Sequence, residues 1–498
     1  MLKSARKVPL RIFAALIVTV ALAGCTVGPD FQKPEVSTAS TYLAETPPVQ
    51  TAAIPGPGGN PQRFTADGTL PAQWWSLFGS EPLDRLVRAA LAESPTLAQA
   101  KARLVQAGEA FNAGAGTTFF PQVDAHLSVD RKQMNPAALG IANVPNPGPF
   151  TLYNASVSVS YALDLMGGNR RSLEGLAAKV EYRQFELEAA RQTLAANVVN
   201  AAIRQAALRS QISRLRDLVA ARSQQLTIIE ARHKQGGIAD LDLRNQSLLL
   251  EQTRAALPPL ENQLTRVNNQ LAAYLGREPA AAQIDRFELD SLHLPEELPL
   301  SLPSALARQR PDIRAAEALW HAAGANVGVA TANLYPQVTL SASLGSQQTG
   351  PEDLVRDLNV WNLGGNLIQP IFRGGELRAR KRSALAAYDE AAAVYRQTVL
   401  QGFREVADTL SALDADARTL KPRVEAANHA RASYAIAQKQ YEAGGISHLV
   451  LLDVQRQLLQ TEFDSIQARA DRYTDTAALL HALGGGWWNA APESEAPR

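Results

Sequence analysis

The sequence has one cysteine, Cys25, so an internal disulfide is excluded. After residue 24 no window holds 18 consecutive apolar residues, which excludes a transmembrane helix from the rest of the chain. The chain also has no large excess of charge of one sign, because it contains 49 basic and 48 acidic residues. Removing residues 1–24 takes away four basic residues and no acidic one, which leaves a net charge near −3. This balance gives no indication of a nucleic-acid partner or a polybasic membrane patch.

The sequence also lacks the spacing of residues that catalysis or metal binding needs. The seven histidines form no HExxH motif and no pair at the spacing of metal ligands, and Cys25 is the only cysteine that could join them as a ligand. No convergent set of nucleophile, base and metal ligand is visible, so we expect neither an enzyme nor a bound metal or cofactor. His233 and His448 are expected to be solvated surface residues.

The first residues have the pattern of an export signal. A basic segment is followed by an apolar run of 11 residues, 12–22, interrupted only by Thr19, which is too short to cross a bilayer as a helix. The run ends in Leu22-Ala23-Gly24-Cys25, which resembles the lipobox of bacterial lipoproteins. We therefore predict lipid attachment at Cys25; the alternative is that Cys25 is only a small apolar residue ending the leader. Thr26 follows Cys25. Inner-membrane lipoproteins usually carry aspartate at this position, so the threonine indicates the outer membrane.

The chain repeats itself at an offset of about 208 residues. Gly236-Gly237-Ile238 aligns with Gly444-Gly445-Ile446, and Leu275-Gly276 aligns with Leu483-Gly484 at the same offset. Copies of this length indicate a duplicated domain and exclude a solenoid array. The predicted division is a signal peptide (1–24), an N-terminal anchor and equatorial segment (25–82), a first repeat (83–280), a linker (281–303), a second repeat (304–488) and a flexible tail (489–498).

Each copy has two segments with the alternating pattern of a β-strand. In the first copy they cover residues 123–130 and 153–161. In the second copy they cover residues 338–344 and 359–372. The pattern of the last segment is weaker, because Gly364, Gly365 and Pro370 interrupt it. One apolar and one polar face suit a sheet exposed to water on one side, and the lengths suit transmembrane strands. A soluble, half-buried sheet is the alternative.

Four such strands cannot close a barrel in lipid, where open sheet edges are not tolerated. Two protomers would give eight strands with a filled lumen, and three would give twelve with a pore. Faces rich in serine, asparagine and glycine favour the wet lumen, and hence a trimer.

Helical segments are expected around these strands. Each copy opens with one (83–118 and 304–333) and continues after its strands with a much longer one (168–235 and 375–443). Each long stretch reaches about 100 Å at 1.5 Å per residue. Apolar residues recur at spacings of 3 and 4, as in supercoiled helices, and the Gly-Gly-Ile segments predict turns that give one antiparallel hairpin per copy. Pro258-Pro259 is expected to break the regularity of one returning helix as a kink.

The mature start, Cys25 to Pro34 (CTVGPDFQKP), resembles the opening of NodT-type outer-membrane efflux lipoproteins, within the wider TolC-like group. Trp74-Trp75-x-x-Phe78, both Pro-Gln-Val strand starts, Phe372-Arg373-Gly374-Gly375 and Tyr441-x-x-Gly444 extend the resemblance over essentially the whole mature chain. It implies a mainly α-helical fold with a transmembrane β part, a homotrimer with a twelve-stranded barrel in the outer membrane, and a helical tunnel through the periplasm. It further implies a periplasmic adaptor, an inner-membrane pump commonly of the resistance-nodulation-division class, and a role as a passive exit duct.

The resemblance also implies a gate at the hairpin tips. Asp453, nine residues after Gly444, matches the aspartate that rings the constriction, and Tyr441 matches a tyrosine that ties neighbouring helices. Asp242, six residues after Gly236, matches the aspartate that this tyrosine contacts in the closed state. Ile446 stands where one relative has arginine, so a closing network is thinner here. The alternative is that both aspartates merely occupy the first turn of a helix, where the dipole favours negative charge.

A different class of protein remains open at this point. A periplasmic adaptor or tethering lipoprotein could also carry long coiled-coil helices without a pore. Adaptors usually carry one hairpin, whereas here the hairpin and the strand pair occur twice.

Overall fold

The computed structural model describes residues 26–34, 41–44, 48–65, 68–133, 148–354 and 358–490. The chain divides into two compact units, each built from separate stretches of sequence. The first contains residues 1–34, 104–183 and 316–395, and the second contains 35–103, 184–315 and 396–498. The signal peptide, Cys25 and residues 491–498 of the expected tail lie outside the described residues.

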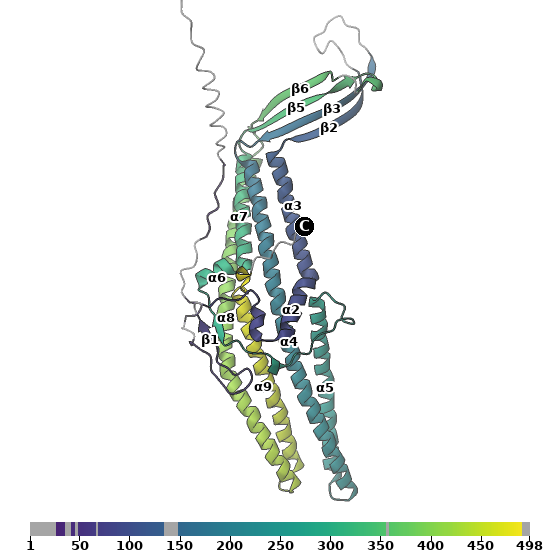
Figure 1. Cartoon of the computed structure of the whole chain (residues 1–498), viewed down its shortest axis with the longest axis vertical. Helices are drawn as coiled ribbons and strands as arrows, with labels where there is room; N and C mark the ends of the chain where they lie inside the picture. Colours follow the sequence, from purple (N-terminus) through teal and green to yellow (C-terminus); the bar gives the residue numbers. More distant parts are fainter. Residues whose placement is uncertain are drawn as a thin grey trace, which may run out of the picture. The chain divides into compact units, whose positions relative to one another are not determined.

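The first unit contains a four-stranded antiparallel sheet in the order β2-β3-β5-β6 (Figure 1). Its strands are β2 (Gln122–Gln133), β3 (Pro149–Leu163), β5 (Gln337–Gln348) and β6 (Val360–Ile368). Each repeat contributes two adjacent strands, so the predicted strand pairs are confirmed. The fourth is shorter than expected, and Gly364 and Gly365 do not interrupt it because they pair with Ser341 and Leu340.

The register aligns the apolar positions of all four strands. Val123 pairs with Val159, which pairs with Ala342, which pairs with Leu363. A neighbouring row joins Ala125, Val157, Leu344 and Trp361. Large members of these rows are exposed in the single chain, with Trp361 and Leu363 each 77% accessible. An apolar face of this extent marks a surface made for lipid or for a protein partner.

Two helical hairpins form much of the second unit. Helix α4 (Gly168–Lys234) is followed by α5 (Asp240–Tyr274), and α8 (Glu376–Glu442) by α9 (His448–Ala482). The two copies have equal lengths, 67 and 35 residues, which is the physical counterpart of the repeat in sequence. Among the described residues, no helix combines the length and the apolar character needed to cross a membrane.

Prolines act differently in the short and long helices. The opening helix of each copy, expected as one, is two: α2 (Glu81–Glu93) and α3 (Pro95–Phe119), then α6 (Pro303–Gln309) and α7 (Pro311–Ala332). The residue before each proline is extended, because the proline ring disfavours helical geometry there. Helix α5 continues through Pro258 and Pro259, and the expected kink there stays a prediction. Both prolines are exposed, and so are Arg254 and Ala255, whose carbonyls lose their helical donors and can bond to water.

The remaining elements are short. Strands β1 (Arg63–Thr65) and β4 (Glu297–Pro299) pair in parallel within the second unit. The described residues also form short 3₁₀ helices: η1 (Trp74–Phe78), η3 (Leu289–Ser291), η4 (Pro351–Asp353) and η5 (Trp487–Asn489).

Candidate functional site

Glycines close both hairpin tips by the same backbone motif. Gly236 and Gly444 adopt left-handed φ values of 73° and 76°. The amide of Gly236 donates to the carbonyl of His233 at 2.9 Å, and that of Gly237 to Arg232 at 2.9 Å. Gly444 and Gly445 repeat both bonds with Tyr441 and Gln440, at 3.0 and 2.7 Å. These are Schellman caps, which need a residue free to adopt positive φ, so the predicted turn glycines have a local backbone reason.

Two side chains of the second hairpin tip are in contact, and an aspartate of the first hairpin acts on both by its charge. The ring of Tyr441, at the end of α8, lies 5.2 Å from the ring of His448, the first residue of α9. Burial raises the pKa of Tyr441, and the nearby carboxylate of Asp242, from α5, raises it further. Asp242 therefore lies close enough to act on Tyr441 by its charge, and its role in closing a channel stays a prediction.

His448 differs from the expectation of a solvated surface residue. It is 5% exposed, and neither ring nitrogen has a hydrogen-bond partner. Burial lowers the pKa of its imidazole, against the opposing effect of the Asp242 carboxylate. The sequence contained a signal for this position, because His448, Leu451 and Gln455 follow the seam spacing of three and four, and all three are buried.

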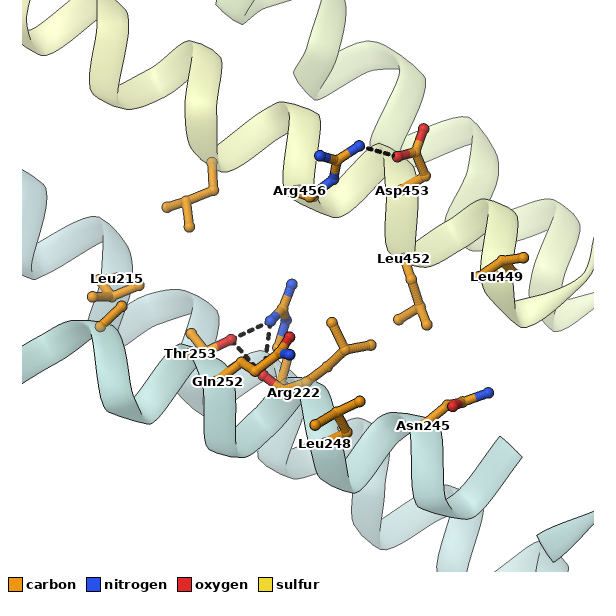
Figure 2. A pocket seen from close by; sticks show the side chains of 13 residues that line it. Leu215, Arg222, Asn245, Leu248, Gln252, Thr253, Leu449, Leu452, Asp453 and Arg456 are labelled. Atoms are coloured by element: carbon orange, nitrogen blue, oxygen red, sulfur yellow. Dashed lines mark hydrogen bonds and ion pairs between the residues drawn. The ribbon is translucent and has the colours of Figure 1, made fainter. Parts of the chain in front are cut away.

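Asp453 lies one turn further along α9 and is exposed. It accepts hydrogen bonds from two residues of its own helix, from Arg456 at 2.7 Å (Figure 2) and from Gln457 at 2.9 Å. The helix-dipole alternative applies to Asp242, which is in the first turn of α5, but not to Asp453, since the first turn of α9 holds no acidic residue. The constriction role of Asp453 stays a prediction.

A buried polar layer connects the four helices of the two hairpins. Gln455 of α9 donates both to Gln225 of α4 and to Tyr434 of α8, each at 3.2 Å. Gln246 of α5 donates to the backbone carbonyl of Arg222 at 3.2 Å. Gln246 and Gln455 are 0% and 1% exposed, so this layer fixes how the hairpins pair in register. Sequence reasoning missed it, because glutamines within an apolar seam have no distinctive spacing.

The segment after the predicted lipidation site is bound within the first unit. The amide of Val27 donates to the carbonyl of Met166 at 3.2 Å, and Arg171 bonds to the carbonyl of Val27 at 3.3 Å and to the carboxylate of Asp30. Phe31 stacks on His321 with ring centroids 4.5 Å apart. A chain held at these points keeps residue 26 near the start of α4, whatever is attached to Cys25.

These features define a class of protein: a duplicated, mainly helical chain with two long hairpins and an open sheet that exposes a continuous apolar face. In the part of the chain that the structure describes, no group of three or more histidine, cysteine, aspartate or glutamate residues could hold a metal ion.

The family follows from comparison with known proteins. Residues 86–277 and 302–485 match the family described as outer membrane efflux protein, so both copies match and the chain belongs to this family. The predicted family, its efflux function and its outer-membrane location are confirmed.

Individual relatives agree over most of their length. The chain is 33% identical to the pyoverdine export outer membrane protein OpmQ of Pseudomonas aeruginosa, over 85% of this chain and 90% of that one. It is 29% identical to the toluene efflux pump outer membrane protein TtgF of Pseudomonas putida, over 96% and 97%. The solved outer-membrane channel OprN superposes with a TM-score of 0.81 at 29% identity, over 93% of this chain and 100% of that one.

Proposed function

We propose that this chain is the exit duct of a tripartite efflux pump, through which small molecules pass passively from the periplasmic side to the exterior. The observation that carries the proposal is the match of both copies to an efflux family, in a chain with two hairpins and one open sheet. An adaptor or tether without a pore would have no use for a duplicated amphipathic sheet.

The functional form is a homotrimer. Strands β2 and β6 are the edges of the sheet in one chain, and its apolar rows run across all four strands to these edges. Backbone groups at such edges need partners in lipid, so adjacent protomers pair β2 with β6 around a twelve-stranded barrel. Each protomer adds two hairpins to a periplasmic tunnel.

The partners follow from the position of the tips. A periplasmic adaptor meets the hairpin ends around Gly236 and Gly444, and an inner-membrane pump of the resistance-nodulation-division class supplies the driving force. Two relatives are named for cargoes as different as pyoverdine and toluene, which supports a duct whose substrates are chosen by the pump.

The chain is also anchored by lipid at Cys25, after cleavage of residues 1–24. The two repeats, 83–280 and 304–488, act as the structural halves of each protomer. The segment 25–82 joins the anchor to the first repeat, and the linker 281–303 joins the two repeats.

Expression of the full precursor in a bacterial host tests assembly and anchoring together. We expect a trimer in the outer-membrane fraction that resists detergent and dissociates on heating. Cys25→Ala should abolish incorporation of radiolabelled palmitate, whereas the adjacent Thr26→Ala should retain it. A monomer in the inner membrane would overturn the duct, and palmitate retained in Cys25→Ala would overturn the anchor alone.

A further inference from the structure

An open cavity of about 410 Å³ lies in the tip half of the two hairpins. Its walls come from α4 and α5 on one side and α9 on the other (Figure 2). Six leucines supply most of the apolar wall: Leu215, Leu248, Leu249, Leu449, Leu452 and Leu459. This volume is in the range of small-molecule sites, which are mostly apolar with a few polar groups that fix orientation.

One of the lining residues is a buried arginine without a carboxylate. Arg222 is 5% exposed, and Figure 2 shows its side chain extending into the space between α9 and the α4–α5 pair. Its Nη1 donates to the carbonyl of Leu249 at 3.0 Å and to the hydroxyl of Thr253, which are both uncharged. Its buried Nε has no hydrogen-bond partner.

This arrangement is costly for a charged group. Burying a cation without an opposite charge costs several kcal/mol, so buried arginines are normally paired. Burial accordingly lowers the pKa of Arg222, and the charge effect that opposes it comes from Tyr434 and not from a carboxylate. Among the described residues, no carboxylate forms a salt bridge with this guanidinium.

The opposite wall does not supply the missing charge. Asp453 is the one acidic residue of the lining, and its carboxylate is already bound to Arg456 at 2.7 Å and to Gln457 at 2.9 Å. The lining contains two cations, Arg222 and Arg456, and one anion, Asp453, so its net charge is +1. A neutral apolar ligand would leave Arg222 unpaired, and a cation would be repelled.

We propose that this cavity is a binding site for a small amphipathic anion, whose carboxylate pairs with Arg222 while its apolar body lies against the leucines. The guanidinium of Arg222 extends toward this space, and charge-assisted bonds of guanidinium to carboxylate are the strong kind. The site is formed within one chain by α4, α5 and α9, so binding there does not depend on what passes through a channel.

The probe is 2-naphthoate, an aryl carboxylate, titrated calorimetrically into the purified full-length protein in dodecyl maltoside, with the heat of micelles alone subtracted. We expect saturable binding and a rise in melting temperature. The neutral analogue 2-naphthalenemethanol, which partitions into micelles without a charge, should produce neither effect.

Arg222→Gln should weaken naphthoate binding by about tenfold or more, since a charge-assisted pair is lost. The matched control is Arg254→Gln, which changes an exposed arginine of α5 that pairs with Glu251 at 2.8 Å and lies outside the cavity lining. A purely structural role for Arg222 would lower the melting temperature of the Arg222→Gln protein but leave the ligand-induced shift in place.

A second variant keeps the test decisive if Arg222→Gln folds poorly. Leu248 lines the cavity and is 55% exposed, so Leu248→Glu can place a carboxylate in the wall with little cost to folding. We expect this variant to lose naphthoate binding while retaining a normal melting temperature. Absence of saturable binding to the unaltered protein, equal binding of the alcohol, or undiminished binding to Leu248→Glu would each overturn the proposal.

Discussion

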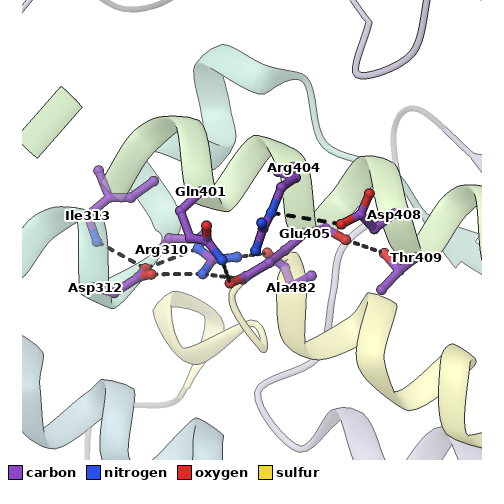
Figure 3. A network of polar contacts seen from close by, with 9 residues as sticks. All are labelled: Arg310, Asp312, Ile313, Gln401, Arg404, Glu405, Asp408, Thr409 and Ala482. Atoms are coloured by element: carbon purple, nitrogen blue, oxygen red, sulfur yellow. Dashed lines mark hydrogen bonds and ion pairs between the residues drawn. The ribbon is translucent and has the colours of Figure 1, made fainter. Parts of the chain in front are cut away.

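At the scale of single residues, Arg310 shows how a buried charge can hold separate segments together. Its guanidinium bonds Asp312 through two nitrogens, at 3.0 and 2.7 Å, and Glu405 of α8 at 2.8 Å (Figure 3). It also donates to the carbonyl of Ala482, at the end of α9, at 2.9 Å. Unlike Arg222, Arg310 has two carboxylates against it, and together they raise its pKa despite burial.

Arg310→Ala is predicted to destabilise the protein by about 3 kcal/mol, because it leaves two carboxylates and a carbonyl without their shared donor. Scanning fluorimetry of the purified protein measures the resulting fall in melting temperature. Arg404→Ala is the control, since Arg404 is an exposed residue of α8 that lies 3.8 Å from Asp408. An equal fall in melting temperature in both variants would show that the buried network contributes no more to stability than an exposed ion pair.

Asp416 of α8 is predicted to make stability depend on pH. Burial raises the pKa of its carboxyl to about 7, and the adjacent Asp475 of α9 adds to the shift by a hydrogen bond and by its charge. The folded state therefore holds a proton that the unfolded chain releases near pH 4, so stability falls as pH rises from about 4 to about 7.

Asp416→Asn removes the ionisable group and should raise the melting temperature at pH 8 by about 2 °C, with little change at pH 5. The comparison is Asp414→Asn, two residues away, whose carboxylate pairs with Arg418 at 2.9 Å and should not benefit from neutralisation. A melting temperature of Asp416→Asn that falls at pH 8 would contradict the prediction.

Sequence reasoning could find buried positions in the helices but not their polar partners. The seam spacing predicts which face of a helix is covered, whereas Arg310 meets residues 95 and 172 positions further along the chain. Such pairs depend on how the hairpins pack, and neither spacing nor composition encodes that. The same limit explains why Arg222 was not singled out.

At the scale of elements, repetition and periodicity predicted most of the fold. The long helices begin and end within a residue or two of expectation, because Gly236 and Gly444 stop them by a backbone motif that only glycine fits easily. Prolines were less informative. Pro95 and Pro311 divide helices that were expected to be continuous, and each follows a residue in the extended conformation, whereas Pro258 and Pro259 lie within a continuous α5.

The tip of the second hairpin is predicted to lose stability in mildly acidic solution. His448 is buried with its pKa lowered from 6.5, so the folded state favours the neutral ring. The stabilisation is complete above about pH 6.5 and is lost as pH falls below it. Tyr441 and Asp242 face the ring, and the Asp242 carboxylate offsets only part of the burial effect.

His448→Phe keeps a ring in the same space without an ionisable nitrogen, and it should reduce the drop in melting temperature between pH 7.5 and pH 5. His233→Gln changes the histidine of the other tip, which is partly exposed and hydrogen-bonds to the carbonyl of Ile238 at 3.0 Å. The melting temperature of His233→Gln should fall between pH 7.5 and pH 5 by as much as that of the unaltered protein. An unchanged drop in His448→Phe would assign the acid sensitivity elsewhere.

At the scale of the whole molecule, the proposed trimer converts each tip residue into a ring of three. Asp453 is exposed and already paired with Arg456, so the ring combines three carboxylates with three guanidinium groups. Removing the carboxylates would leave the arginines unpaired around the axis. The structure thus makes selectivity, which depends on net charge, a more direct test than width alone.

Asp453→Ala is therefore predicted to weaken or reverse cation preference in planar bilayers, and to raise single-channel conductance if the carboxylates also narrow the passage. Asp408→Ala is the matched control, because Asp408 is likewise exposed and pairs with an arginine of its own helix, Arg404, but lies on α8 far along the chain from the turn. A reversal potential that shifts in Asp453→Ala and not in Asp408→Ala would assign the constriction to the second tip. Equal values in both variants and in the unaltered channel would remove Asp453 from the pore and leave Tyr441 and Asp242 as the remaining candidates for closure.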